Sequence, residues 1–514
     1  MSGFTLGKIN KTLSQGKFLL LGVFLFFPGI AGCQFIFNSN CCTAYQSVFS
    51  CRFTEAEKLI EAEKKLHPGN HIPVLLENYI DFLVLFTNED PVDLSRLGKN
   101  ETARLTLLEK ADKDSPYYRF SLAQVQLQWA FVRIKFGEFL PAILEIRHAN
   151  ALLEENKRIY PGFSLNNCGL GVIHTLAGIV PDQYKWLANL LGFQGSVEQG
   201  TKELNQIARY NGDDEIINLF KPEVFFYLSF IESNLRKDPL AALQVLNLVK
   251  KFQRESGSEE SPLIIFSKAS ILMKTGGNDE AIKLLTHYST QQGQYRIHYL
   301  TYLLGIAKLN RLDPDADQWF LKYLQEYKGL NYIKAAYQKA AWCCLVKGDK
   351  ERFLDYLLMA GEKGVSVVDE DKQAFNEARK KIVPNMSLFR ARLLFDGGYY
   401  DQALHELTMK PVKDFAFSGR DFLEYTYRLG RIYHQKGNIP AAKQYYIQTI
   451  KMGSDQHYYY AANAALQMGL ISEGERNIPE ATRYYNLCLS LPYDEYKNSL
   501  SQKAKAGLER VQHP

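Results

Sequence analysis

Apolar residues recur along the chain every three or four positions, with polar and charged residues between them, which is the spacing of amphipathic helices. Thr54 to Leu66 is rich in Glu, Ala and Lys, and Phe120 to Ile159 has the pattern of two helices that end before Pro161. The alternation that marks a β-strand is nowhere sustained. The pattern therefore predicts an all-α fold.

The clearest repeated pattern is a helix pair in the last third of the chain, from Tyr425 to Ser454. Gly430 lets the two helices approach, Gly437 supplies a left-handed helix end, and Ala442 packs where a larger side chain would clash. With Tyr433, these positions resemble the signature of the tetratricopeptide repeat, which places small and large residues at fixed points on two antiparallel helices. The signature also includes Leu429 and Tyr446.

The same spacing of five residues from Gly to Ala recurs in the chain at Gly137/Ala142, Gly276/Ala281 and Gly398/Ala403. A further unit keeps Gly469 and Ala481. The step from Ala403 to Ala442 to Ala481 is 39 residues each time, longer than the usual repeat of about 34. Asp494 to Val511 is a polar helix with one apolar stripe, as expected of a cap. We therefore predict a tetratricopeptide-repeat helical solenoid.

Composition divides the chain into four parts. The polar stretch from Lys251 to Pro262 is expected to be the boundary between an N-terminal helical domain, residues 53–250, and C-terminal repeats with a cap helix, residues 263–512. Residues 1–32 read as a signal peptide of the lipoprotein type, and residues 33–52 as a tether between the lipid and the folded chain.

The signal has a basic start, an apolar centre and a small-residue end. Three lysines and no acidic residue precede the apolar run from Phe18 to Phe27. The sequence from Ile30 to Cys33 (IAGC) resembles a bacterial lipobox, in which the Cys33 thiol receives the lipid. Gln34 follows the cysteine in place of Asp, so the resemblance to lipoproteins favours the outer membrane.

An uncleaved anchor is the alternative. The stretch from Phe18 to Phe37 is uncharged, and its 20 residues match the roughly 20 that cross a bilayer. Pro28, Gly29 and Gly32 weaken a continuous helix there and favour the lipoprotein. In both cases the bulk of the chain lies in the cell envelope, outside the cytoplasm.

The cysteines after Cys33 do not form a CxxC pair, so the spacing of a metal site is missing. Two states remain open for Cys51. It forms a disulfide with Cys41 or Cys42 in an oxidising compartment, or all three are free thiols.

The stretch from Tyr160 to Leu204 is the most distinctive part of the chain. An apolar helix is followed by Pro181, which opens a second helix, and by the sequence LGFQG from Leu191 to Gly195. This hairpin, and the order of parts over residues 50–512, resemble a eukaryotic family of tetratricopeptide proteins associated with mitochondrial inclusion-body clearance and lipid homeostasis, the tetratricopeptide repeat protein 39 family. The export signal departs from that family.

The resemblance implies binding or scaffolding and transfers no catalytic residue. The apolar side chains of the hairpin are expected to be buried; contact with a membrane or an apolar ligand is the alternative.

Charge and motifs argue against several classes of function. The chain has 61 basic and 56 acidic residues; without Lys8, Lys11 and Lys17 the balance falls to +2, too small for a field that attracts phosphates. The ten histidines do not cluster, and we find no P-loop and no nucleophile elbow. We expect no catalytic residue, no metal, no cofactor and no nucleic-acid partner.

Tyrosine gives the one surface signal, because the run Tyr458, Tyr459 and Tyr460 is hard to bury completely. Rigid aromatic side chains on a concave repeat surface suit a peptide or a sugar. Packing between helices is the alternative, since Tyr446 and Tyr485 occupy core positions of their repeats. We predict a non-enzymatic, membrane-tethered scaffold with a protein or peptide partner. A glycan- or nutrient-binding surface lipoprotein is the second hypothesis.

Overall fold

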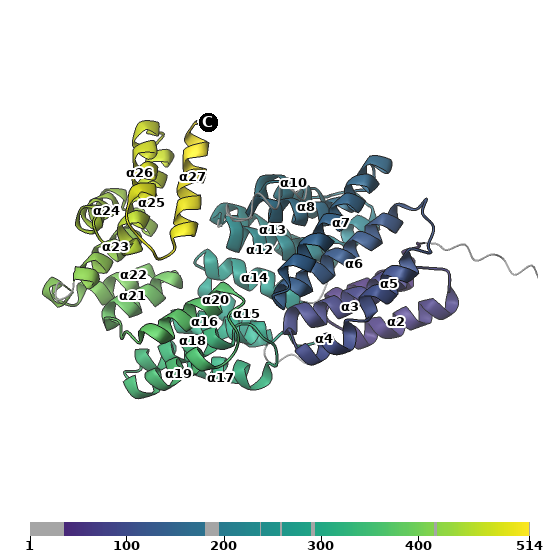
Figure 1. Ribbon diagram of the computed structural model, residues 1–514, viewed down its shortest axis with the longest axis horizontal. Helices are drawn as coiled ribbons and strands as arrows, with labels where there is room; N and C mark the ends of the chain where they lie inside the picture. The colour runs from purple at the N-terminus through teal and green to yellow at the C-terminus, as the bar shows by residue number, and fades with distance from the viewer. Residues whose placement is uncertain are drawn as a thin grey trace, which may run out of the picture.

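The computed structural model describes residues 35–179, 195–236, 238–257, 260–288, 293–415 and 419–512. These segments contain helices and no β-strand, so the predicted all-α fold is confirmed. Most helices form antiparallel pairs, and each pair packs on the next to give a solenoid of tetratricopeptide type. In Figure 1 the array runs from purple helices on the right, through green helices below, to yellow helices at the upper left.

The N-terminal half extends to α13. Its helices are α1 (Ser39–Phe49), α2 (Phe53–Leu66), α3 (Ile72–Asn88), α4 (Pro91–Leu97), α5 (Asn100–Leu108), α6 (Pro116–Lys135), α7 (Phe139–Ile159), α8 (Asn166–Ile179), α10 (Val197–Ala208), α11 (Glu215–Leu219), α12 (Lys221–Phe230), the π-helix η2 (Ile231–Arg236) and α13 (Pro239–Ser256). Helices α6 and α7 pack along each other as the predicted first pair.

The C-terminal half consists of repeat pairs and a final helix that packs on α25 and α26, where a cap was predicted. Its helices are α14 (Pro262–Lys274), α15 (Asn278–Tyr288), α16 (Tyr299–Asn310), α17 (Ala316–Glu326), α18 (Ile333–Val346), α19 (Lys350–Glu362), α20 (Asp369–Lys380), α21 (Met386–Asp396), α22 (Tyr400–Thr408), the 3-10 helix η3 (Val412–Asp414), α23 (Gly419–Gln435), α24 (Ile439–Gly453), α25 (Tyr459–Gly474), α26 (Ile478–Ser490) and α27 (Lys497–Gln512).

The turns inside the pairs explain the Gly-to-Ala spacing. The glycines lie between the two helices in the left-handed region, with φ of +82° at Gly137, +84° at Gly276, +82° at Gly398 and +76° at Gly437. The alanine five residues later is fully buried in every case, at Ala142, Ala281, Ala403 and Ala442. A glycine can adopt this φ without strain, and only a small side chain fits the buried position. In the next pair Ala481 is also fully buried.

Two glycines on first helices lie against tyrosine rings of the second helices. A Cβ at Gly430 would lie 2.7 Å from Cδ1 of Tyr446, and a Cβ at Gly469 would lie 2.5 Å from Cε1 of Tyr485. Tyr433 stacks on the ring of the second-helix residue Tyr445, with ring centres 5.6 Å apart. The small residues therefore set the distance between the helices of each pair.

The segment predicted as a tether, residues 33–52, instead belongs to the folded domain from Phe35 onward. Helix α1 buries Tyr45 and Val48 in the main core, and the Tyr45 hydroxyl donates to the buried Glu223 carboxylate at 2.7 Å. Apolar residues at helical spacing make this segment a core helix. Cys41 and Cys51 are buried there as free thiols, so the structure favours the thiol state over a disulfide.

The predicted boundary at residues 251–262 does not separate two cores. Helix α13 continues to Ser256, and α14 begins at Pro262 and packs against it. One buried cluster extends from Phe35 to Ala307, across this turn. The polar residues that suggested a domain boundary lie instead at the end of an amphipathic helix and in a short connection.

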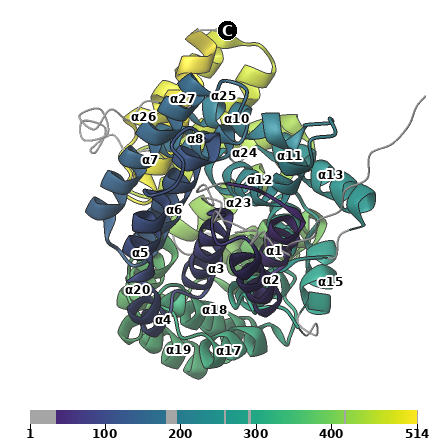
Figure 2. The same ribbon diagram turned by 90° about the vertical axis from the view of Figure 1, so that its right-hand side faces the viewer.

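A buried carboxylate joins the two halves of the chain. Glu89, which ends α3, accepts hydrogen bonds from Asn331 Nδ2 at 2.5 Å and from Lys135 Nζ at 2.7 Å. Asn331 lies just before α18, so helices far apart in sequence meet here. In Figure 2, which views the molecule from the right-hand side of Figure 1, α3 accordingly lies in front of α18.

Candidate functional site

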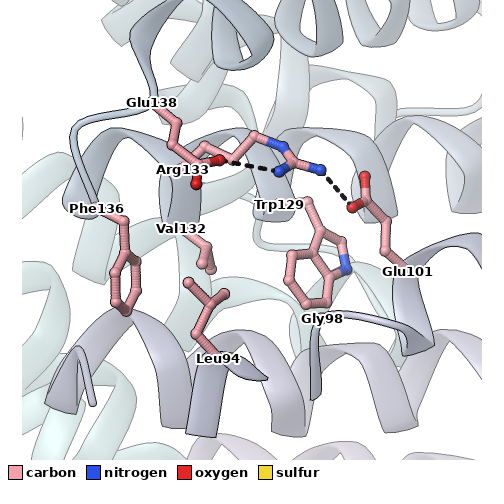
Figure 3. Close-up of a pocket in the computed structure, with 8 residues that line it drawn as sticks. All are labelled: Leu94, Gly98, Glu101, Trp129, Val132, Arg133, Phe136 and Glu138. Atoms are coloured by element: carbon pink, nitrogen blue, oxygen red, sulfur yellow. Dashed lines mark hydrogen bonds and ion pairs between the residues drawn. The ribbon is translucent and has the colours of Figure 1, made fainter. Parts of the chain in front are cut away.

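A pocket of about 200 Å³ opens in the N-terminal half, among α4, α5 and α6 (Figure 3). It is lined by Leu94, Gly98, Glu101, Trp129, Val132, Arg133, Phe136 and Glu138. The Arg133 guanidinium donates to Glu101 at 2.6 Å, to Glu138 at 3.1 Å and to Glu145 at 2.5 Å. No hydroxyl, thiol or amine side chain lines this pocket, and its cation is already paired. The pocket is therefore a weak candidate for chemistry.

Three carboxylates around one guanidinium leave an excess of negative charge. Burial raises the pKa of Glu145 to about 7, and the charge of the neighbouring Glu101 adds to this effect, although Arg133 opposes it. Glu145 thus takes up a proton near neutral pH, which matters for stability rather than for binding.

Other site types are not found in the described part of the chain. Within it, no group of three His, Cys, Asp or Glu side chains is arranged to hold a metal ion. No helix there combines the length and apolar character needed to cross a bilayer. The predicted lipid site Cys33, the rest of the signal, and the hairpin residues from Pro181 to Gln194 lie outside the described residues.

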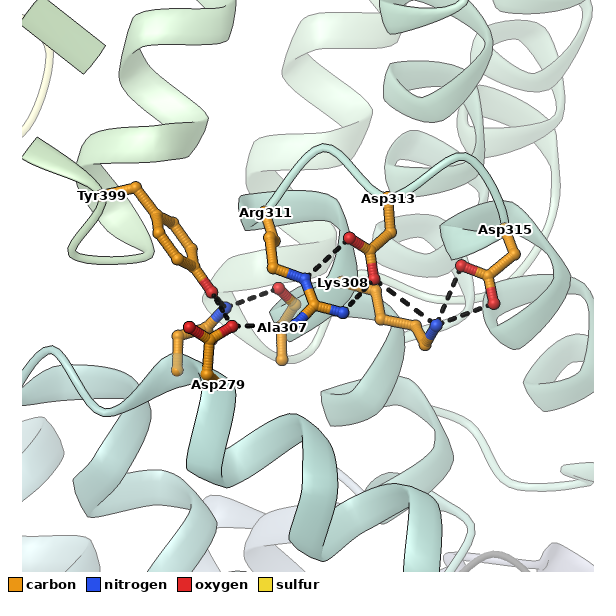
Figure 4. Close-up of polar contacts among 8 residues, drawn as sticks. Asp279, Ala307, Lys308, Arg311, Asp313, Asp315 and Tyr399 are labelled. Carbon is orange, nitrogen blue, oxygen red and sulfur yellow. Dashed lines mark hydrogen bonds and ion pairs between the residues drawn. The ribbon is translucent and has the colours of Figure 1, made fainter. Parts of the chain in front are cut away.

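The stacking of the repeats departs from chain order at α21. Its turn packs on the turn between α14 and α15, where a Cβ at Gly398 would lie 2.8 Å from the Cα of Gly276. The Tyr399 hydroxyl donates to Asp279 at 2.8 Å and accepts from Asn278 at 3.0 Å (Figure 4). Helix α21 therefore packs against α16, although α17 to α20 lie between them in sequence. Helices α18, α19 and α20 pack on one another beside this contact.

The same polar network reaches the turn after α16. Arg311 donates to Asp279 at 2.8 Å and to Asp313 at 2.6 Å, and Lys308 donates to Asp315 at 2.7 Å (Figure 4). The hydrogen bonds from Arg311 and Tyr399 hold the pKa of Asp279 below its ordinary value, so this carboxylate stays charged and holds the turns together. As a result, α21 faces α18, and Arg392 of α21 reaches the ring of Trp342 on α18.

We define the inner face as the surface that α18, α21, α23 and α25 turn towards one another. It consists of Lys339, Trp342, Arg392, Tyr427, Arg431 and Tyr459, and all of these except the buried Tyr427 are half-buried. Lys380, at the end of α20, pairs at 3.1 Å with Glu495, just before α27. This ion pair brings the cap of the array back towards α20, so the last repeats curve around the inner face.

Trp342 on α18 lies between two cations. Lys339 Nζ is 3.3 Å from the centre of its ring, and Arg392 Cζ, from α21, is 4.4 Å from it. The indole nitrogen donates to Glu377 on α20 at 2.7 Å. Burial lowers the pKa of Lys339 to about 7, against the opposing effect of Glu377. The rings compensate these cations in part.

The next repeat presents a similar arrangement on α23. Arg431 donates to the Tyr427 hydroxyl at 2.9 Å, and its guanidinium lies 4.9 Å from the centre of the Phe395 ring on α21. Arg431 follows Arg392 by 39 residues, which is the repeat step from Ala403 to Ala442. The two arginines therefore occupy equivalent positions in successive repeats.

The cations of the inner face have no carboxylate at ion-pair distance. Among the described residues, no carboxylate oxygen lies within 4.0 Å of the charged nitrogens of Lys339, Arg392 or Arg431, whose contacts are instead to rings, a hydroxyl and an amide oxygen. The Nη2 atom of Arg392 and the Nε atom of Arg431 are buried and have no hydrogen-bond acceptor. The exposed part of these half-buried guanidinium groups lies beside aromatic rings and has no carboxylate at ion-pair distance, which makes this surface the strongest candidate for binding an anionic group.

The predicted tyrosine run lies at the edge of this face. Tyr460 is buried, and its hydroxyl donates to Glu424 at 2.6 Å. Tyr459 packs its ring between those of Tyr460, at 4.5 Å, and Tyr496, at 4.9 Å. Tyr458 is half-buried beneath Arg420. The three tyrosines therefore do not form one exposed stack.

Glu424 belongs to a separate, satisfied pair. Burial alone would raise its pKa, but Arg428 and the Tyr460 hydroxyl hold the pKa below its ordinary value. Arg428 Nε donates to Glu424 at 2.7 Å. The hydrogen bond from Tyr460 on α25 fixes α23 against α25, and the Glu424–Arg428 pair lies within α23.

Comparison with known proteins gives limited information. No protein-family model and no curated protein matches the sequence, so the likeness to the inclusion-body clearance family stays a prediction. Among solved structures, the chain is similar to human IFIT1, solved as a dimer with m7Gppp-AAAA, with 14% identity and a TM-score of 0.32 over 94% of this chain and 97% of that one. It is also similar to yeast Tom70, with 13% identity and a TM-score of 0.23 over 92% and 96%. At such low scores neither likeness bears on function.

Proposed function

We propose that this chain is a non-enzymatic scaffold that holds a protein or peptide partner on the inner face of its C-terminal repeats. The observation that carries the proposal is the set of half-buried cations without acidic partners, Lys339, Arg392 and Arg431, which lie beside aromatic rings. Arginine and aromatic side chains supply most of the binding energy at protein interfaces. Equivalent positions in successive repeats suit a partner that crosses several repeats.

The location of the scaffold is a further part of the proposal. The signal of residues 1–32 and Cys33 favour a lipid-anchored protein of the bacterial envelope, at the outer membrane. Helix α1 belongs to the core, so the folded domain begins within a few residues of Cys33. The proposed lipid would therefore hold the domain close to the membrane.

The scaffold is tested by affinity purification of the full chain from detergent-solubilised envelope. The inner-face variant Arg392→Glu, Arg431→Glu is compared with Lys350→Glu, Arg352→Glu on the exposed side of α19. We expect wild type and the α19 variant to retain one stoichiometric protein that the inner-face variant loses. Loss in both variants, or in neither, would contradict the proposed site.

The lipid anchor is tested by mass spectrometry of the mature N-terminus and by fractionation of Cys33→Ser. We expect a lipid-modified N-terminal Cys33 in the wild type, and an unmodified chain in the variant. An unmodified Cys33 with residues 1–32 still attached would show that the segment is an uncleaved anchor.

A glycan-binding role has less support. It depends on exposed tyrosines, whereas Tyr460 is buried and Tyr459 is packed between two other rings. The observed contacts fit the packing alternative for this run.

A further inference from the structure

We propose that the inner face binds an extended acidic peptide segment whose carboxylates pair with Arg392 and Arg431 and whose apolar side chains contact Trp342. This inference rests on the proposed function, because it names the chemistry of the partner held on the same surface.

The first step is the state of the two arginines. Each guanidinium is half-buried against rings, Arg392 at 4.4 Å from the ring centre of Trp342 and Arg431 at 4.9 Å from that of Phe395. Each also has one buried nitrogen without an acceptor. These two nitrogens are enclosed, and the exposed remainder of each half-buried guanidinium can pair with a carboxylate while the ring contact holds it in place.

The second step is the spacing of the two arginines. They occupy equivalent positions on α21 and α23, which contact each other directly. Packed helices have axes roughly 8–10 Å apart, and an extended segment of the polyproline II type advances about 3.1 Å per residue with three residues per turn. Two carboxylates three residues apart in such a segment therefore lie on one side, about 9 Å apart, and match the two arginines.

The third step is the sign of the surrounding charge. Glu377 accepts a hydrogen bond from the Trp342 indole, and the charges of Glu377 and Asp396 both act on Lys339, so carboxylates lie among the cations of this surface. A nucleic acid carries a phosphate at every residue and would meet these carboxylates. A peptide with spaced acidic residues avoids them. The observations therefore favour a peptide over a nucleic acid.

Lys339 and Trp342 extend the site beyond the arginines. The Lys339 ammonium contacts the Trp342 ring, and its one hydrogen bond is to the Gln338 amide oxygen at 2.8 Å. A third acidic residue can pair with this ammonium, while an apolar side chain covers the exposed edge of the indole. The proposed ligand is thus acidic and partly apolar.

The test measures fluorescence anisotropy with the full chain in detergent and three labelled ten-residue peptides. The first has glutamates three residues apart, the second has the same composition with adjacent glutamates, and the third has lysines in their place. We expect the first peptide to bind most tightly, the third not to bind, and affinity to fall as salt rises. Equal binding of all three peptides would overturn the inference.

Variants then locate the site. Arg392→Gln, Arg431→Gln should weaken the first peptide by about tenfold or more, since each replacement removes a charge-assisted hydrogen bond. The control Lys350→Gln, Arg352→Gln removes the same charge from exposed positions on α19 and should change affinity by less than about twofold. Circular dichroism confirms that both variants fold. Equal weakening by both variants would show a diffuse charge effect and overturn the proposed site.

Two outcomes separate this inference from the proposed function. Recovery of an inner-face partner from the envelope, together with no preference among the peptides, leaves the scaffold standing and overturns the acidic ligand. Selective peptide binding without any envelope partner supports the ligand chemistry and counts against the scaffold. Tighter binding of an oligouridine probe, lost in the same arginine variant, would assign the surface to RNA and overturn the inference.

Discussion

Replacing Gly430 by alanine tests the packing that defines the repeats. The new Cβ would lie 2.7 Å from Cδ1 and 2.8 Å from Cε1 of Tyr446, whereas carbon atoms pack at about 3.5–4.0 Å. The ring or the helix must therefore move by about 1 Å. Such overpacking costs about 1–3 kcal/mol, and the better helix propensity of alanine returns about 1 kcal/mol.

The control is Gly474→Ala, at the end of α25, where a Cβ would meet nothing within 4 Å. It isolates the propensity gain, so the difference in stability between the two variants measures the clash itself. We expect Gly430→Ala to be less stable than Gly474→Ala by about 1–3 kcal/mol. Hydrogen exchange of the amides in α23 and α24 gives the local opening free energy.

A second substitution checks the cause. In a Tyr446→Leu background the ring is absent, so Gly430→Ala should lose most of its cost. The reasoning is refuted if Gly430→Ala is as stable as Gly474→Ala, or if its cost is unchanged in that background.

Three further predictions concern charged groups. Because the pKa of Glu145 is raised to about 7, the protonated side chain stabilises the fold fully at pH 4, and this stabilisation is lost as pH rises through 7. Melting curves should show that Glu145→Gln removes up to about 3 kcal/mol of the pH dependence of stability. A variant whose stability changes between pH 5 and 8 as much as that of the wild type would contradict this prediction. Lys339, with its pKa lowered to about 7 among Gln338, Trp342, Glu377 and Arg392, is charged at pH 6 and largely neutral at pH 8. The acidic peptide should therefore bind several-fold more tightly at pH 6, and Lys339→Met should abolish that dependence; a dependence that persists in the variant excludes Lys339 as its source. Glu89→Gln leaves the Lys135 ammonium without its buried carboxylate partner, so we expect the free energy of unfolding to fall by about 3 kcal/mol and amide hydrogen exchange around Asn331 to become faster. Exchange at the wild-type rate would contradict this prediction.

The repeats could be predicted because their requirements are local. A turn that needs a positive φ selects Gly437, and a crowded helix contact selects Ala442 and Gly430. These demands recur at fixed spacing, so the sequence displays them directly. Helix α1 was missed because its position after the export signal suggested a tether, although Tyr45 and Val48 have core spacing.

The inner face could be predicted only in part. Arg392 and Arg431 are 39 residues apart, and that step was visible beside the alanine repeat. The contact of Arg392 with Trp342 depends on α21 stacking against α16, through the approach of Gly398 to Gly276. No local pattern encodes a contact between turns that far apart in sequence.

The most direct test of the central claim is photo-crosslinking in cells. A photoreactive phenylalanine analogue is placed at Trp342 and Tyr459 on the inner face, and at Leu354, which is 45% exposed on α19, as the outer control. We predict that both inner positions crosslink to the same protein and that Leu354 does not. Crosslinks at Leu354 equal to those at the inner positions, or none at Trp342 and Tyr459, would contradict the inner face as the binding surface.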